Sequence, residues 1–349
     1  MDKPKICLIY TGGTIGMNRD SQGVLHPPEN PEDFLKLAPE LKDLADYDFV
    51  SVLNKDSTNI IPEDWTKIAE TIYQRRNDGY IGFVVAHGTD TMHFSASAVA
   101  LALGNNLNFP VVFTGAQTAP DVYHGDARIN LLRAFKVAEA NIAEVVICFG
   151  DFVFRGCRAQ KKDERRFEAF ESPAFFPLAH ITENILITNM AYKRSDKSGD
   201  IKLNSKFASG ILQVSLIPGL EPTLLESLLE HRECKGIVLQ SFGAGNVPSA
   251  GAGEKYSWES FIKHAKDYGK PVLITSQFPA NATSHTAYEP GKAAEAAGAI
   301  PTGNMTSACA TAKFRWVLAQ VEYIQDKDEK IAKIRDMMNT DYVGEFDTE

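Results

Sequence analysis

Two apolar runs near the start of the chain each end in a turn that contains glycine and threonine. Residues 6–10 (ICLIY) lead into TGGTIGM at 11–17, and residues 81–86 (IGFVVA) lead into HGTDTM at 87–92. A short apolar run bounded by turn residues is typical of a strand buried on both faces. Such strands occur in parallel sheets that helices cover on both sides. This feature predicts an α/β fold whose loops line a ligand site at the carboxyl ends of the strands.

The rest of the first half continues to alternate strands and helices. Further strands are predicted at 48–53, 110–114 and 145–149, and helices at 95–103 and 127–140, the last capped by Asp126. Two more helices are expected to begin at Pro31, after Asn30, and at Pro62, because proline is favoured in the first helical turn. Alternation of this kind indicates a parallel sheet with helices on both faces.

The polar stretch 192–207 lacks apolar periodicity and predicts a linker or an exposed hairpin. A second alternation follows, with strands expected at 211–217, 236–240 and 272–275 and helices at 221–231, 258–266 and 326–338. We therefore expect a larger N-terminal parallel-sheet domain at residues 1–190, a linker at 191–208 and a smaller C-terminal α/β domain at 209–349.

Composition excludes several classes of protein. The net charge of −9 argues against nucleic acid as a partner. No apolar run is long enough to span a bilayer, and the start of the chain carries no export signal, so we expect a cytoplasmic protein without a membrane partner. The five cysteines have no paired spacing and are interpreted as reduced thiols, and no Cys/His cluster has zinc-ligand spacing.

Polar residues follow each of the first four predicted strands. The segments are 11–14 (TGGT), 56–58 (DST), 87–91 (HGTDT) and 114–117 (TGAQ). If the strands are parallel neighbours, these loops converge and offer hydroxyls, carboxylates and backbone N–H groups. That set suits a small substrate with an amine and a carboxylate, together with an oxyanion site. Two threonine hydroxyls beside an acid suggest acyl transfer to a threonine nucleophile.

Each feature taken alone has a simpler interpretation. A glycine-rich turn after a strand is often only a turn, and the chain has neither GxGxxG nor the lysine of a phosphate-binding loop. Residues 56–58 could be a turn or a helix cap, and His87 could be a structural histidine. The combination of threonine-bearing loops favours the chemical interpretation.

Taken together, these loops resemble a known family. TGGTIGM and HGTDTM are similar to the two signatures of the bacterial-type L-asparaginases, which are threonine amidohydrolases, and the likeness is closest to the cytoplasmic type I branch. It extends over most of the chain, through DS at 56–57, PEDW at 62–65, FTGAQ at 113–117, RGCR at 155–158 and GNVP at 245–248.

The resemblance implies catalytic roles for five residues. Thr14 would attack the side-chain amide, while Thr89, Asp90 and a lysine would form a proton-transferring set. Lys161 is preferred over its neighbour Lys162, because the spacing from RGCR to residues 167–170 (FEAF) keeps it in register. The lysine must be neutral to accept a proton. Because a nearby carboxylate opposes the loss of the lysine proton, Asp90 is expected to hold the substrate ammonium as well as to orient Lys161.

The fifth role falls to Tyr288. Many relatives carry a tyrosine ten positions after the nucleophile, where this chain has Val24. Some type I relatives share the valine and use a tyrosine of the C-terminal domain, and Tyr288 occupies that place here. It would reach Thr14 from a neighbouring subunit of a homodimer or a dimer of dimers.

The resemblance also implies the substrate contacts. Asp56, Ser57 and Thr58 would hold the α-amino and α-carboxylate groups together with Thr89 and Asp90, and Ala116 and Asn246 would complete the site. No metal and no cofactor are expected.

The activity implied is hydrolysis of L-asparagine to L-aspartate and ammonia through an acyl-threonine. A glutaminase or mixed enzyme is an alternative, because one methylene discriminates by only about 1–3 kcal/mol. A second alternative is the amide-hydrolysing subunit of a tRNA-dependent amidotransferase, against which the acidic balance and the lack of an N-terminal extension argue. A third is a non-catalytic asparagine-binding regulator, against which the intact signatures argue.

Overall fold

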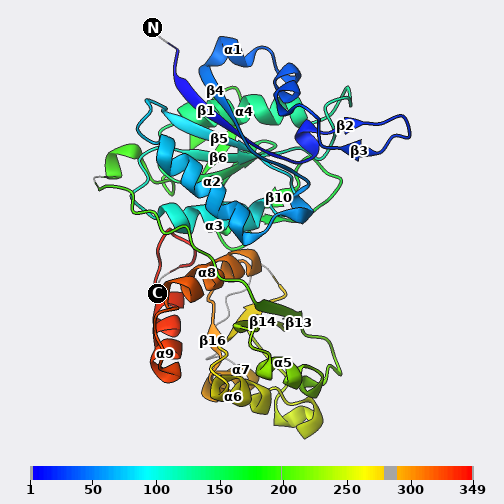
Figure 1. Cartoon of the computed structure of the whole chain (residues 1–349), viewed down its shortest axis with the longest axis vertical. Coiled ribbons are helices and arrows are strands. Elements are labelled where there is room, and N and C mark those ends of the chain that lie inside the picture. The colour runs from blue at the N-terminus through cyan, green and yellow to red at the C-terminus, as the bar shows by residue number, and fades with distance from the viewer. Residues whose placement is uncertain (1–2, 198, 279–288, 348–349) are drawn as a thin grey trace. The chain divides into compact units, whose positions relative to one another are not determined.

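The apolar run that opens the chain forms β1, Lys5–Gly12, inside the larger of two main sheets (Figure 1). This computed structural model describes residues 3–197, 199–278 and 289–347. The chain divides into two compact units, Met1–Ser205 and Lys206–Glu349.

The sheet of the first unit has the strand order β12-β11-β8-β7-β6-β5-β1-β4 in the described part of the chain. Its strands are β4 (Asp46–Lys55), β5 (Gly82–Ala86), β6 (Val111–Thr114), β7 (Val145–Phe149), β8 (Phe152–Arg155), β11 (Ala179–Ile181) and β12 (Ile185–Ile187), with β1. Strands β4, β1, β5, β6 and β7 run parallel to one another. The predicted α/β fold with a largely parallel N-terminal sheet is therefore confirmed.

One edge of this sheet differs from the expectation. Strand β8 runs antiparallel to β7, and β11 and β12 continue in antiparallel fashion. Phe149 pairs with Phe152 across a two-residue turn in which Gly150 has φ 58°. So short a connection cannot return the chain to a parallel start, because a parallel crossover needs a dozen or more residues.

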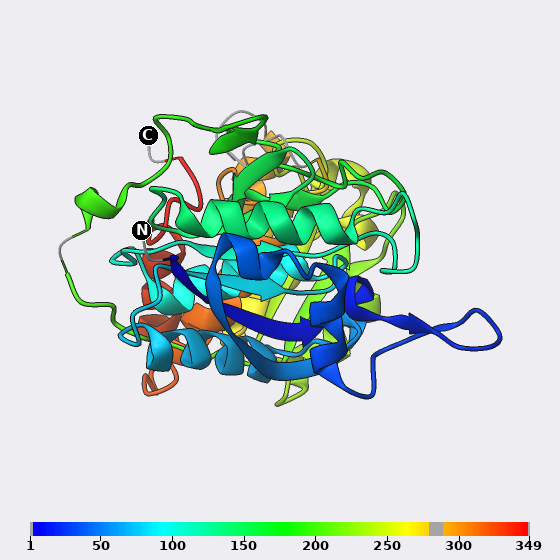
Figure 2. The ribbon, with the colours of Figure 1, turned by 90° about the horizontal axis from the view of Figure 1, so that it is seen from above.

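Helices cover both faces of this sheet because alternate strand residues point to opposite sides. Leu8, Val84 and Val112 pack in one core with Leu131 and Phe135 of α4, Ala127–Glu139. On the other face lie α2, Pro62–Arg75, and α3, Met92–Leu103 (Figure 2). The central strands are thus apolar on both faces, as their sequences indicate.

The first unit contains several shorter elements. These are the 3-10 helices η1 (Thr14–Gly16), η2 (Pro31–Leu37), η3 (Ser57–Asn59), η4 (Gly156–Arg158) and η5 (Arg194–Asp196), the helix α1 (Leu41–Leu44), and the strand pairs β2 (Asn18–Arg19) with β3 (Leu25–His26) and β9 (Gln160–Lys161) with β10 (Phe170–Glu171). Segment 192–207 contains η5 and no hairpin within its described residues. Arg194 anchors it, because its guanidinium donates to the carbonyls of Ala138 and Ala140.

The second unit contains a parallel sheet with the order β13-β14-β15-β16 among its described residues. Its strands are β13 (Ile211–Ser215), β14 (Gly236–Ser241), β15 (Val272–Ser276) and β16 (Ile300–Pro301), and its helices are η6 (Pro222–Leu225), α5 (Glu226–Glu230), η7 (Ala250–Ala252), η8 (Glu254–Tyr256), α6 (Glu259–Asp267), α7 (Glu289–Ala297), α8 (Ser307–Gln320) and α9 (Lys327–Met338). The helix expected at 221–231 is thus a 3-10 turn followed by a short α-helix.

None of the five cysteines, which all lie in the described ranges, forms a disulfide, and burial raises the pKa of the Cys7 and Cys148 thiols to about 12. Across the described ranges, no helix combines the length and the apolar character needed to cross a membrane.

Candidate active site

Four polar loops meet at the carboxyl edge of the larger sheet. They follow β6, β5, β1 and β4, which are consecutive neighbours in the sheet. The chain order reverses between β1 and β5, because β4 is added on one side of β1 whereas β5, β6 and β7 are added on the other. In open α/β sheets, ligands bind at such a switch point. Both sequence signatures therefore lie at the position that this topology favours for a site.

Glycines allow these loops to approach without intervening side chains. Gly13 has φ 87°, and a Cβ built on it would lie 2.3 Å from the Cα of Gly88. A Cβ on Gly88 would lie 2.6 Å from Ser57 Oγ, and one on Gly115 would lie 2.3 Å from the His87 carbonyl oxygen. All these distances are shorter than real Cβ contacts, so a larger residue would push the loops apart.

The threonines of the two signatures make different contacts. Thr11 donates to the Ala86 carbonyl at 2.9 Å, and Thr91 donates to the Ser57 carbonyl at 2.8 Å. These two hydroxyls therefore tie neighbouring loops together. Thr14 begins η1 beside Gly13 and is half-buried, and its hydroxyl makes no hydrogen bond to any described residue of the first unit. Thr89 has contacts of another kind.

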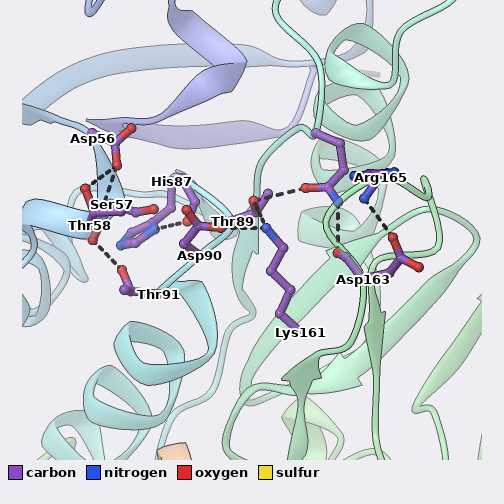
Figure 3. Close-up of polar contacts among 12 residues, drawn as sticks. Asp56, Ser57, Thr58, His87, Thr89, Asp90, Thr91, Lys161, Asp163 and Arg165 are labelled. Atoms are coloured by element: carbon purple, nitrogen blue, oxygen red, sulfur yellow. Dashed lines mark hydrogen bonds and ion pairs between the residues drawn. The ribbon is translucent and has the colours of Figure 1, made fainter.

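Thr89, Lys161 and Asp90 form a chain of charged and polar contacts (Figure 3). The Lys161 ammonium lies 2.8 Å from Thr89 Oγ1 and 2.6 Å from Asp90 Oδ1. Thr89 is 6% exposed and the Lys161 side chain 13%, whereas that of Asp90 is 58% exposed. The outer end of the chain is thus an accessible carboxylate, and its inner end is a buried hydroxyl.

A short hairpin positions the lysine. Lys161 pairs with Phe170 between β9 and β10, and the Lys162 N–H donates to the Ala169 carbonyl at 2.8 Å. Because successive strand residues point to opposite faces, only one of the two lysines can face Thr89. Lys162 forms an ion pair with Glu171 at 3.6 Å instead. The structure therefore brings Lys161, and not Lys162, to the cluster.

The segment after β4 is a capped turn. Asp56 is the N-cap of η3, and its Oδ1 accepts from both the N–H and the hydroxyl of Thr58 at 2.8 Å (Figure 3). Thr58 is exposed, while Ser57 is buried against Gly88. These residues therefore do form a helix cap, as the simpler interpretation predicts. Within the described first unit, Asp56 Oδ2 has no partner and stays available to a ligand.

The loop after β6 contains a contact that the sequence analysis did not anticipate. Ala116 is 1% exposed, and its neighbour Gln117 reaches the threonine cluster. The Thr89 hydroxyl donates a hydrogen bond to Gln117 Oε1 at 3.1 Å. The signal was present in the sequence, because Gln117 follows β6 at the same edge as the other loops.

The Asp126 carboxylate holds this loop and also accepts from the side-chain amide of Asn130 in α4 at 3.1 Å. Asp126 occupies the N-cap position of α4 but makes no side-chain cap hydrogen bond there. Its carboxylate accepts from the backbone N–H groups of Gln117 and Thr118 and from the Thr118 hydroxyl. Asp126 is the N-cap residue of α4 as predicted, but its carboxylate bonds to the adjacent loop and makes no side-chain cap hydrogen bond to the first helical turn.

Two histidines near the cluster are held in the neutral form. Burial lowers the pKa of His87 to about 4, although the Gly88 carbonyl and Asp64 oppose the change. The same cause lowers the pKa of His93 to about 4, and the Lys161 ammonium contributes. His87 donates from Nδ1 to the Gly88 carbonyl at 2.7 Å, which fixes its tautomer.

A shallow cleft of about 640 Å³ opens beside Asp90 and Lys161. Its lining includes three acidic and three basic side chains together with His93: Asp90, Asp163, Glu164, Lys161, Lys162 and Arg165. The balance of charge suits a zwitterionic ligand better than a purely anionic one. In the part of the chain that the structure describes, no group of three or more His, Cys, Asp or Glu residues could hold a metal ion.

Two expected site residues do not belong to the described part of the first unit. Asn246 belongs to the second unit, where its backbone pairs with Phe242 in the turn after β14. Tyr288 lies outside the described residues. The cluster at the switch point is thus built from the first unit.

Known proteins of two kinds are similar to this chain. Glutamyl-tRNA(Gln) amidotransferase subunits D of Methanosphaera stadtmanae and Methanothermobacter thermautotrophicus are each 32% identical to it, over 99% and 98% of the chain and 77% of each relative. Among solved structures, the thermostable L-asparaginase of Thermococcus kodakarensis is 29% identical with a TM-score of 0.87, and L-asparaginase I of Vibrio cholerae is 30% identical with a TM-score of 0.84. Each structural match covers 99% of this chain and 100% of the other.

Two family models match consecutive parts of the sequence. The model described as "Asparaginase, N-terminal" covers residues 5–193, and that described as "Glutaminase/Asparaginase C-terminal domain" covers residues 211–337. The first includes every residue of the cluster at the switch point. With both halves matched and the threonine loops at the expected sheet edge, the chain belongs to the asparaginase family.

Proposed function

We propose that this protein hydrolyses L-asparagine to L-aspartate and ammonia through an ester formed on Thr14. The observation that carries the proposal is the contact chain from Asp90 through Lys161 to Thr89, at a switch point shared with the Thr14 loop. A hydroxyl joined to an amine, which is oriented in turn by a carboxylate, is the arrangement that activates a nucleophile or a water. The full-length likeness to L-asparaginase structures supports the same activity.

In the first step, the Thr14 oxygen attacks the side-chain carbonyl carbon of asparagine. The C–N bond then breaks, the leaving NH2 group takes up the proton that Thr14 has given up and departs as ammonia, and an acyl ester remains on Thr14. Tyr288, supplied by a neighbouring subunit, relays the Thr14 proton through its hydroxyl to the leaving nitrogen in this step. The proposal therefore includes association of like chains in the cytoplasm, as a homodimer or a dimer of dimers.

In the second step, a water attacks the ester. Thr89 passes the water's proton to a neutral Lys161. The C–O bond to Thr14 then breaks, the Thr14 oxygen takes up that proton, and aspartate leaves with the Thr14 hydroxyl restored. Asp90 holds Lys161 in place and binds the substrate ammonium through its exposed carboxylate. In this proposal, Asp56 Oδ2 is a second acceptor for that ammonium, and Ser57 and Thr58 hold the α-carboxylate. Ala116 and Asn246 complete the contacts.

A second candidate is glutamine hydrolysis as part of an amidotransferase. The identity of 32% to subunits D of glutamyl-tRNA(Gln) amidotransferases over nearly the whole chain favours it. Both functions need the same acyl-transfer chemistry. They differ in the preferred amide and in whether a charged tRNA and other subunits raise the activity.

The test is ammonia release from asparagine and from glutamine, with and without added glutamyl-tRNA. The proposal predicts turnover of asparagine by the chain alone. Dominant glutamine turnover that depends on glutamyl-tRNA would favour the amidotransferase function, and no release from either amide would exclude both.

Two variants test the threonines. Thr14→Val and Thr89→Val keep the shape of the side chain and remove its hydroxyl, so each should abolish most turnover. Because residues that act as a unit are non-additive, the double variant should be scarcely worse than the worse single one. Wild-type turnover by either folded single variant would contradict the assignment.

A further inference from the structure

The side chain of Gln117 connects the buried hydroxyl of Thr89 to the hairpin that carries Lys161. Its Oε1 lies 3.1 Å from Thr89 Oγ1, while its Nε2 lies 3.0 Å from the Asp163 carbonyl oxygen and 3.4 Å from that of Arg166. Residues 163–166 belong to the loop between β9 and β10. One amide thus spans two segments that are far apart in sequence.

The direction of this amide is fixed by its partners. A carbonyl oxygen only accepts hydrogen bonds, and a side-chain NH₂ group only donates them. Turning the amide over would place its oxygen against two backbone carbonyls and lose both of their hydrogen bonds. The NH₂ group therefore faces Asp163 and Arg166, and the oxygen faces Thr89.

The backbone around Gln117 is held equally firmly. Its N–H donates to both oxygens of Asp126, which is 3% exposed. On the other side, Asp163 Oδ1 accepts from the backbone N–H groups of Arg165 and Arg166 at 2.7 and 3.0 Å. Both ends of the bridge are therefore set by local hydrogen bonds that do not involve the cluster.

This geometry determines where the Thr89 proton lies. Lys161 as an ammonium can only donate to Thr89 Oγ1, and Gln117 Oε1 can only accept from it. The Thr89 hydroxyl consequently directs its proton to Gln117 and one lone pair to Lys161. Once the amine is neutral, the hydroxyl can turn and donate to it.

We propose that Gln117 is a positioning residue, which fixes the Thr89 hydroxyl direction and tethers the Lys161 hairpin beside it. The inference rests on the proposed function, since it assigns Gln117 to the amide-hydrolysing site. The residue acts through Thr89 and Lys161 and need not touch the substrate.

The kinetic test compares Gln117→Met with a matched structural control. Gln117→Met removes the acceptor and both donors while keeping the length of the side chain. Its kcat for asparagine should fall on the order of a hundredfold, because displaced catalytic groups lose about that much. Its KM should change little, because the groups that hold the substrate remain.

Thr118→Val is the control, because it removes two hydrogen bonds to Asp126 from the same loop, one donated and one accepted by the hydroxyl, and leaves the Gln117 side chain in place. It should keep the wild-type kcat even if its Tm falls. A Gln117→Met kcat within about twofold of the wild type would overturn the proposal. So would an equal loss of kcat in Thr118→Val, since that result would assign the effect to loop stability.

Gln117→Glu provides a readout that a merely structural role would not give. A protonated glutamic acid can donate to one carbonyl and still accept from Thr89, whereas the carboxylate would face two carbonyl oxygens. Its kcat relative to the wild type should therefore rise as the pH is lowered. A ratio that does not change with pH would contradict the assigned contacts.

Neutron diffraction from D₂O-exchanged crystals of the whole protein separates this inference from the proposed function. Where three deuterons are seen on Lys161 Nζ, the Thr89 deuteron should lie on the line to Gln117 Oε1, and a Thr89 deuteron pointing elsewhere in that state would overturn the inference whatever the activity. If the wild type hydrolyses neither amide, the proposed function fails, while the deuteron still decides the hydroxyl direction.

Discussion

Replacing His87 by asparagine should reduce the loss of stability of this protein in acid. His87 is fully buried at the end of β5, and its Nε2 has no hydrogen-bond partner among the described residues. Burial lowers its pKa from 6.5 to about 4. Between these two values the unfolded chain binds a proton at this imidazole and the folded chain does not. The free energy of unfolding therefore rises with pH across this window and falls as the solution is acidified.

The magnitude follows from the two pKa values. A folded-state pKa about 2.5 below that of the unfolded chain corresponds to roughly 3 kcal/mol of stability, present above pH 6.5 and lost by about pH 4. His87→Asn keeps a donor near the Nδ1 position, which can still reach the Gly88 carbonyl, but cannot titrate. The variant will be less stable at neutral pH because it leaves space in the core, and that cost does not depend on pH.

The assay is urea denaturation followed by circular dichroism at several values between about pH 4 and 7, with the m-values compared to check that the transition is unchanged. The difference in unfolding free energy between wild type and variant should shrink by roughly 3 kcal/mol from neutral to acid pH. Buried carboxylates affect both proteins equally and cancel in this difference. His124→Asn, at an exposed position, reports what exchanging a surface imidazole does by itself. A wild type and His87→Asn that lose stability in parallel would refute the reasoning.

Three further predictions concern activity. Lys161→Met should abolish asparagine turnover whereas Lys162→Met should keep most of it, because only the Lys161 amine reaches Thr89. Steady-state ammonia release gives the comparison, and the reverse pattern would exclude Lys161 as the catalytic lysine. Asparagine should exceed glutamine in kcat/KM, because a clamp on the α-groups misplaces the carbonyl of a longer side chain and about 1 Å of displacement can cost on the order of a hundredfold; equal values would rule out the clamp. Tyr288→Phe should lower kcat with little change in KM. Mixing Tyr288→Phe chains with Thr14→Val chains should restore some activity, because one site of a mixed dimer keeps both groups. If no activity returns after subunit exchange is verified by mass spectrometry, Tyr288 does not act in its neighbour's site.

The amino-acid sequence by itself determined the fold class and the location of the candidate site. Apolar runs ending in glycine-bearing turns identified β1 and β5, and local helix signals identified the start of α2 at Pro62. These features depend on residues that are close together in the chain, so a short window contains the information. The convergence of the four loops also follows from parallel strands.

Tertiary structure decided which side chains meet at that edge. It separated Thr11 and Thr91, which tie loops together, from Thr89, which contacts Lys161 across 72 positions of sequence. It also placed Gln117 against Thr89, 28 positions away, and turned β8 back as an antiparallel strand. Contacts between residues so far apart in the sequence depend on the pairing of β9 with β10 and on the close packing of the loops that contain Gly13, Gly88 and Gly115. No local propensity encodes them, and they exist only once the sheet has assembled.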